Sequence, residues 1–86
     1  MQREQERQEQ QPRVVAVIPK GPNHELRVSL ATHRGRTFGD LRLWVLKDGN
    51  MIPTPRGVTV DVWQLEELES AIVSLRDAAA GGAHPF

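Results

Sequence analysis

An alternating pattern of apolar and polar residues between positions 27 and 45 constrains the fold of this chain most strongly. Over its second half, the odd-numbered positions from 37 to 45 lean apolar, whereas the even-numbered positions from 36 to 44 mix cationic and aromatic side chains. Because side chains alternate between the two faces of a strand, this pattern predicts one apolar face and one face that bears arginines and aromatics. The break at His33-Arg34-Gly35 predicts a turn that joins two antiparallel strands.

Two further segments extend this pair into a sheet. A β-branched run ends at Pro19-Lys20-Gly21-Pro22, and Asp48-Gly49 is a strong turn dipeptide after the alternating run. The two prolines of Pro53-Thr54-Pro55 cannot donate ladder hydrogen bonds, so we expect an irregular connection there before a short last strand. The predicted strands, which form an antiparallel meander, cover residues 14–18, 25–32, 36–46 and 56–60.

From Asp61 the apolar spacing changes from two residues to about 3.6, which is typical of a helix. Asp61 is a suitable N-cap with Gln64 three residues later, and Gly81-Gly82 ends the helix. The fold class is therefore α+β, a four-stranded antiparallel sheet followed by one C-terminal helix. We expect the apolar stripe of this helix to cover the apolar face of the sheet; the stripe consists of Val62, Leu65, Leu68, Ile72 and Leu75.

The charges are unevenly distributed along the 86 residues, although the net charge is zero. Residues 14–60 carry seven basic and three acidic side chains, whereas residues 61–86 carry one and five. Such a local basic surface favours polyanionic partners, and the whole-chain charge conceals it.

The bulk composition narrows the class of protein. A chain of 86 residues allows one small domain, over residues 14–80, between a Gln/Glu/Arg-rich tail at 1–13 and a short tail at 81–86. Because so small a domain buries only about 60 per cent of its unfolded surface, we expect self-association. The chain has no cysteine and no spacing typical of metal ligands, so no metal site is predicted. It also has no nucleophile motif and no paired carboxylates. We therefore expect no enzyme activity, no cofactor and no small-molecule substrate.

The sequence also bears on location. No apolar run approaches the 18 or so residues that span a bilayer, and the first 13 residues lack the apolar core of a signal peptide. We therefore expect a soluble, intracellular protein without a membrane partner, located in the cytoplasm or nucleoid, or in the nucleus of a eukaryote.

From Leu26 to about Ile72 the chain resembles the C-terminal domain of the transcriptional coactivator positive cofactor four. The resemblance is carried by Val28-Ser29, Arg34-Gly35-Arg36, Asp40-Leu41-Arg42, Gly49-x-Met51-x-Pro53, Arg56-Gly57 and the spacing from Gly57 through Leu68 to Ile72. It implies a homodimer built through the helices, with single-stranded DNA bound in channels on the sheets.

The resemblance and the alternation together indicate site residues. The family's basic DNA-contacting positions fall on Arg34, Arg36, Arg42 and Arg56, and its loop aromatic falls on His33. Phe38 and Trp44, on the arginine face, are candidate platforms for base stacking or, alternatively, packing residues at a dimer seam. Asp40 is interpreted as a salt-bridge partner that orients Arg42. The predicted dimer residues are Trp63, Leu68, Ile72 and Leu75.

These observations predict a homodimer that binds single-stranded or locally melted DNA with low sequence specificity. We expect it to act as a transcriptional coactivator or regulator, with the transcription machinery as a further partner, or in DNA maintenance. One alternative is a dimeric protein-interaction module that uses the acidic helix. Another is an RNA-binding variant of the same surface.

Overall fold

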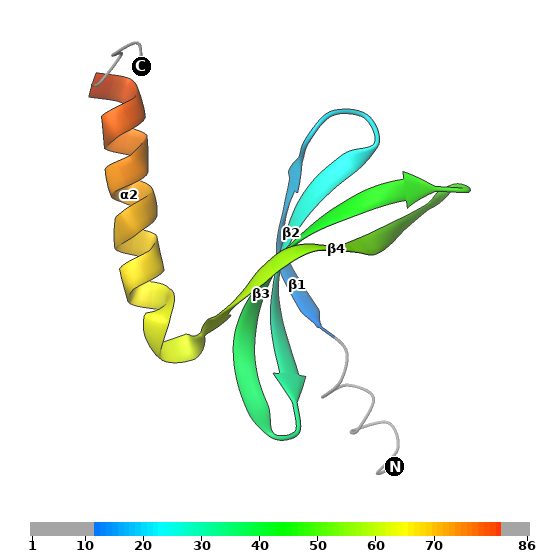
Figure 1. Ribbon diagram of the computed structural model, residues 1–86, viewed down its shortest axis with the longest axis horizontal. Coiled ribbons are helices and arrows are strands. Elements are labelled where there is room, and N and C mark those ends of the chain that lie inside the picture. Colours follow the sequence, from blue (N-terminus) through cyan, green and yellow to red (C-terminus); the bar gives the residue numbers. More distant parts are fainter. Residues whose placement is uncertain (1–11, 82–86) are drawn as a thin grey trace.

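The computed structural model describes residues 12–81, which form a single antiparallel sheet followed by a long helix (Figure 1). The strand order is β1-β2-β3-β4, with each strand beside its neighbour in sequence. This arrangement confirms the predicted fold class; the predicted tails, 1–13 and 81–86, lie largely outside the described residues. The elements are β1 (Arg13–Pro19), β2 (His24–His33), β3 (Arg36–Lys47), β4 (Asn50–Asp61), the 3-10 helix η1 (Val62–Gln64) and α2 (Leu65–Gly81).

Two-residue turns join β2 to β3 and β3 to β4. Arg34 and Gly35 have φ angles of 52° and 76°, and Asp48 and Gly49 have φ angles of 52° and 83°. Two consecutive positive φ angles define the type I′ turn, whose twist matches that of the flanking strands. These turns fix the register of both hairpins and thereby decide which side chains share a face.

β4 is longer than the sequence predicted. The expected start of this strand at residue 56 is wrong, because β4 begins at Asn50 and runs through both prolines. The expected irregularity is present as a register shift within the strand, between Pro53 and Gly57. The register shifts between Arg42 and Trp44, and the hydroxyl of Thr54 donates to the carbonyl of Leu43 at 2.8 Å. An edge strand tolerates proline because its outward N–H groups have no ladder partner.

The pairing register separates the two faces of the sheet as the alternation predicted. Arg27 lies opposite Arg42, and Phe38 lies opposite Asp61. We call the polar side the basic face; its side chains are Glu25, Arg27, Ser29, Ala31, His33, Arg36, Phe38, Asp40, Arg42, Trp44, Thr59 and Asp61. The opposite, apolar face carries Leu26, Val28, Leu30, Leu41, Leu43, Val45, Val58 and Val60.

The helix does not cover the sheet of its own chain, so that prediction is wrong. α2 projects away from the strands (Figure 1), and Ile72 and Leu75 remain 50% and 69% exposed. The helix approaches the sheet at its start, where Leu65 Cδ2 lies 3.4 Å from the position that a Cβ on Gly39 would occupy. Among residues 12–81 no hydrophobic side chain is fully buried, so a single copy of the chain has no closed hydrophobic core. The spacing of the stripe showed that one side of the helix is apolar, but it did not show which surface covers it.

Candidate nucleic-acid interface

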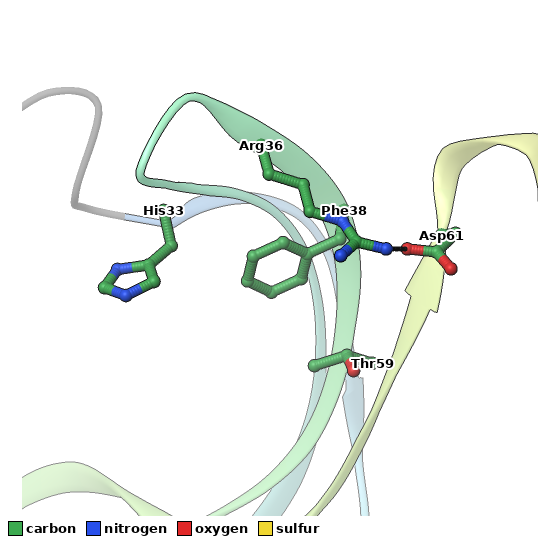
Figure 2. A pocket seen from close by; sticks show the side chains of 5 residues that line it. All are labelled: His33, Arg36, Phe38, Thr59 and Asp61. Atoms are coloured by element: carbon green, nitrogen blue, oxygen red, sulfur yellow. Dashed lines mark hydrogen bonds and ion pairs between the residues drawn. The ribbon is translucent and has the colours of Figure 1, made fainter.

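An open pocket of about 320 Å³ lies at one end of the basic face (Figure 2). Its walls come from three neighbouring strands: His33 from β2, Arg36 and Phe38 from β3, and Thr59 and Asp61 from β4. The type I′ turn after His33 places this imidazole opposite Arg36. The pocket therefore combines two aromatic rings with a cation, a hydroxyl and a carboxylate, a set that can hold a planar, polar group such as a nucleobase.

Arg36 is held in this pocket by the start of the helix. Its Nη2 atom donates to Asp61 Oδ1 at 2.7 Å, while the arginine side chain remains 72% exposed. The backbone N–H of Asp61 donates in turn to Gln64 Oε1 at 3.2 Å, as the predicted capping pair requires. The ion pair thus connects β3 to the residue where the sheet ends and η1 begins.

Arg42 is the most constrained arginine of the basic face. Its Nε and Nη2 donate to the two carboxylate oxygens of Asp40 at 3.2 and 3.0 Å, and its Nη1 donates to the carbonyl of Thr54 at 2.9 Å. The predicted orienting contact from Asp40 is therefore present. The contact with Thr54 also ties the guanidinium to the irregular part of β4.

Trp44 lies toward the other end of the same face, beneath Arg27. The guanidinium carbon of Arg27 is 3.9 Å from the centre of the indole ring, and Arg27 Nε donates to Glu25 Oε2 at 2.6 Å. One side of the predicted stacking platform is thus already occupied by a cation–π contact. Sequence reasoning did not include Arg27 in the site, although it shares its strand face with Ser29 and His33.

Arg34 and Arg56 are two further exposed arginines of the predicted site. Arg34 occupies the tip of the β2–β3 hairpin, and Arg56 lies within the register shift of β4, between Pro53 and Gly57. Within residues 12–81 neither side chain makes a hydrogen bond or an ion pair, although the backbone N–H of Arg56 donates to the Thr54 hydroxyl. Both guanidinium groups are therefore accessible to an incoming anion.

The predicted dimer residues lie apart from the pocket, along η1 and α2. Trp63 is 71% exposed, and Ile72 and Leu75 belong to the uncovered stripe of the helix. Leu68 is half-buried and lines a second, more open groove between β4 and the helix, together with Val60 and Ala71. The structure thus leaves Trp63, Ile72 and Leu75 exposed on the helical segment, away from the pocket.

The comparison with known proteins gives the family. The arrangement to be compared is a four-stranded antiparallel sheet followed by a helix, with arginines and aromatic side chains on one face of the sheet. The family model "Transcriptional Coactivator p15 (PC4)" matches residues 21–71, more than half of the chain, and the chain belongs to this family.

Two crystal forms of BPSL1147, a PC4 homolog from Burkholderia pseudomallei, have a similar structure. The orthorhombic form is 26% identical with a TM-score of 0.72, and the match covers 76% of this chain and 89% of that one. The tetragonal form is 25% identical with a TM-score of 0.73, covering 77% and 98%. Comparison with curated proteins gave no match.

Two further findings on residues 12–81 concern membrane-spanning helices and clusters of metal-binding side chains. No helix within residues 12–81 is long and apolar enough to cross a membrane. In the same range, no group of three or more His, Asp or Glu side chains is placed to hold a metal ion.

Proposed function

We propose that this chain binds single-stranded or locally melted DNA on its basic face, as a homodimer and with low sequence specificity. In this role it acts in transcription, as a coactivator or regulator in contact with the transcription machinery, or else in DNA maintenance. The proposed role is binding, without a catalytic step. The observation that carries the proposal is the pocket in which His33, Phe38 and Arg36 meet on an open sheet face. Membership of the PC4 family supports the same function.

The pocket suits an unpaired base rather than a duplex. Stacking of a base on an aromatic side chain contributes about 1 to 3 kcal/mol and depends little on the identity of the base. His33 and Phe38 both line the pocket, and each offers a ring for such a contact. A base inside a duplex presents only its edges, so access to these rings requires a strand whose bases are splayed outward.

The exposed arginines supply the attraction for the phosphate backbone. Arg34 and Arg56 are both exposed and are not engaged by other described side chains. Phosphate contacts of this kind release counterions, which makes the affinity fall as salt rises. Because these contacts do not read base edges, the resulting sequence preference is weak.

Homodimer formation is supported by the apolar surface that a single chain leaves uncovered. Within residues 12–81 the large apolar residues with substantial exposure include Trp63, Ile72 and Leu75 on the helix side. A small domain that buries no apolar core in one copy has little to offset its conformational entropy. A second copy that covers the helix stripe would supply the missing core.

The deciding experiment is fluorescence anisotropy with a labelled mixed-sequence single strand and its duplex, each across a salt series. We expect tighter binding to the single strand, with a log-log salt slope of about −0.7 for each phosphate contact. A matched RNA strand in competition tests the preference for DNA over RNA. Absence of binding at low salt would overturn the proposal and favour a protein-interaction role for the acidic helix.

A further inference from the structure

Three arginines of the basic face are each paired with a carboxylate on that same face. The three ion pairs come from different places in the sequence, yet the register brings all of them to one side of the sheet. They are Arg27 with Glu25 at 2.6 Å, Arg36 with Asp61 at 2.7 Å, and Arg42 with Asp40 at 3.0 Å. Each of these carboxylates neutralises part of the positive charge of the arginine beside it, so the net positive charge of the face is smaller than its number of arginines suggests.

Each carboxylate occupies at least one N–H donor of its arginine and places a negative charge beside the guanidinium. Carboxylates and phosphates both bind the edge of a guanidinium, through its N–H donors. At Arg42 three nitrogen atoms already donate, two to Asp40 and one to the carbonyl of Thr54. A phosphate that binds Arg42 must therefore compete with a carboxylate for the same N–H donors. At Arg27 and Arg36 one nitrogen donates to the carboxylate, and the negative charge of that carboxylate repels a phosphate that approaches the remaining N–H groups.

Stacking does not require that competition. The planar surface of a guanidinium can lie against an aromatic ring or a base while its edge donates to a carboxylate. Arg27 shows this division of roles, since its Nε donates to Glu25 while its guanidinium lies over the Trp44 ring. The ion pairs thus oppose phosphate binding and leave stacking intact.

We propose that Glu25, Asp40 and Asp61 are specificity-determining residues that make the basic face select single-stranded nucleic acid over polyanions that offer phosphates alone. A single strand gains from stacking and needs few of the paired arginines for its phosphates. A duplex or an inorganic polyphosphate presents no free base and encounters the carboxylates directly. This inference rests on the proposed function and assigns its selectivity to three acidic side chains.

The test compares three proteins by anisotropy and competition. The first is the parent chain, and the second is the double variant Glu25→Gln, Asp61→Asn, in which both side chains keep their shape and asparagine remains a suitable N-cap. The third is the control Glu69→Gln, Asp77→Asn, which removes the same charge from exposed positions on α2. Glu25→Gln alone is measured as well, because it leaves the helix start unchanged. The ligands are a mixed-sequence single strand, its duplex and inorganic polyphosphate.

We expect the double variant to bind duplex and polyphosphate more tightly, by about two- to fivefold for each carboxylate removed, the range for partly exposed charge pairs. Its affinity for the single strand should rise less, so that the ratio of single-strand to duplex affinity falls. The control should keep the ratio of the parent. An unchanged ratio in the double variant, or an equal fall in the control, would overturn the inference.

The polyphosphate measurement keeps the two proposals separable. If the parent bound no single strand, the proposed function would fail. If only the double variant and Glu25→Gln bound polyphosphate more tightly than the parent, the result would still support competition between carboxylate and phosphate. If neither variant bound polyphosphate more tightly, the inference about the three carboxylates would be overturned.

Discussion

The guanidinium of Arg42 occupies the space that a side chain at Gly57 would need. A Cβ added to Gly57 would lie 2.8 Å from Arg42 Cζ and 2.9 Å from the carbonyl oxygen of Leu41. The two residues are cross-strand partners in β3 and β4, next to the point where the register shifts. Glycine at this position therefore allows the arginine to reach Asp40 and Thr54 together.

Replacing Gly57 with alanine should destabilise the fold. The neighbouring Leu41 carbonyl belongs to the backbone and cannot move away easily, so we expect a loss of about 1 to 3 kcal/mol, as for other overpacked sites. Urea denaturation at fixed protein concentration measures the change. Gly81→Ala is the matched control, because a Cβ there meets no atom within 4 Å. Equal stability of Gly57→Ala and the parent would contradict the steric account.

Removing a ring from the pocket should weaken single-strand binding selectively. Phe38→Leu keeps an apolar side chain of similar size but abolishes the π surface, and we expect a loss of about 1 to 3 kcal/mol in binding free energy. His33→Ala should have an effect in the same range, since both residues line the pocket. Anisotropy with single strand and duplex measures both. A parallel loss for the duplex would show that the rings do not contact bases.

The exposed arginines should act through the salt dependence. Arg34→Ala and Arg56→Ala should each weaken binding to different single strands by similar factors and reduce the log-log salt slope by about 0.7. Arg76→Ala serves as the control, because Arg76 is exposed on α2 and lies off the basic face. Titrations at four or more salt concentrations give the slopes. Slopes indistinguishable from that of the parent would argue against phosphate contacts at these two positions.

The apolar stripe of α2 should hold two copies together. Ile72→Glu places a charge on a surface that is 50% exposed in one chain and buried in the proposed dimer. We expect sedimentation equilibrium to show a shift toward monomer, accompanied by a lower melting temperature. Ser74→Glu adds the same charge to another side of the helix and should leave the mass unchanged. A dimer that persists in Ile72→Glu would exclude the stripe as the interface.

Local features of the fold were predictable from the sequence, and non-local ones were not. Gly35, Asp48 and Gly49 are residue types that accept positive φ and so indicate the two turns, and the alternation between the turns assigns the faces. The ion pair between Arg36 and Asp61 joins residues 25 positions apart, so no short sequence motif predicts it. Its existence depends on the register of β3 and β4, which is set by the turn at Asp48-Gly49 and by the register shift between Arg42 and Trp44.

The candidate site shows the same division. Alternation placed Phe38 and Trp44 on one face, and the family resemblance indicated His33. Neither could show that Arg27 covers Trp44 while His33 and Phe38 share an open pocket. Likewise, the helical period identified an apolar stripe without locating its partner. Contacts that depend on side-chain direction across strands, or on a second chain, lie beyond what spacing can specify.

The two prolines of β4 restrict how this sheet can grow. β4 is an edge strand, and Pro53 and Pro55 have no N–H to offer a strand that approaches from outside. An added strand would lose two ladder hydrogen bonds within three residues, so this edge is a poor template for open-ended stacking. The chain thereby exposes much apolar surface while it obstructs fibre-like assembly along β4. Association through the helix, in contrast, can close after two copies and leave the basic face unobstructed.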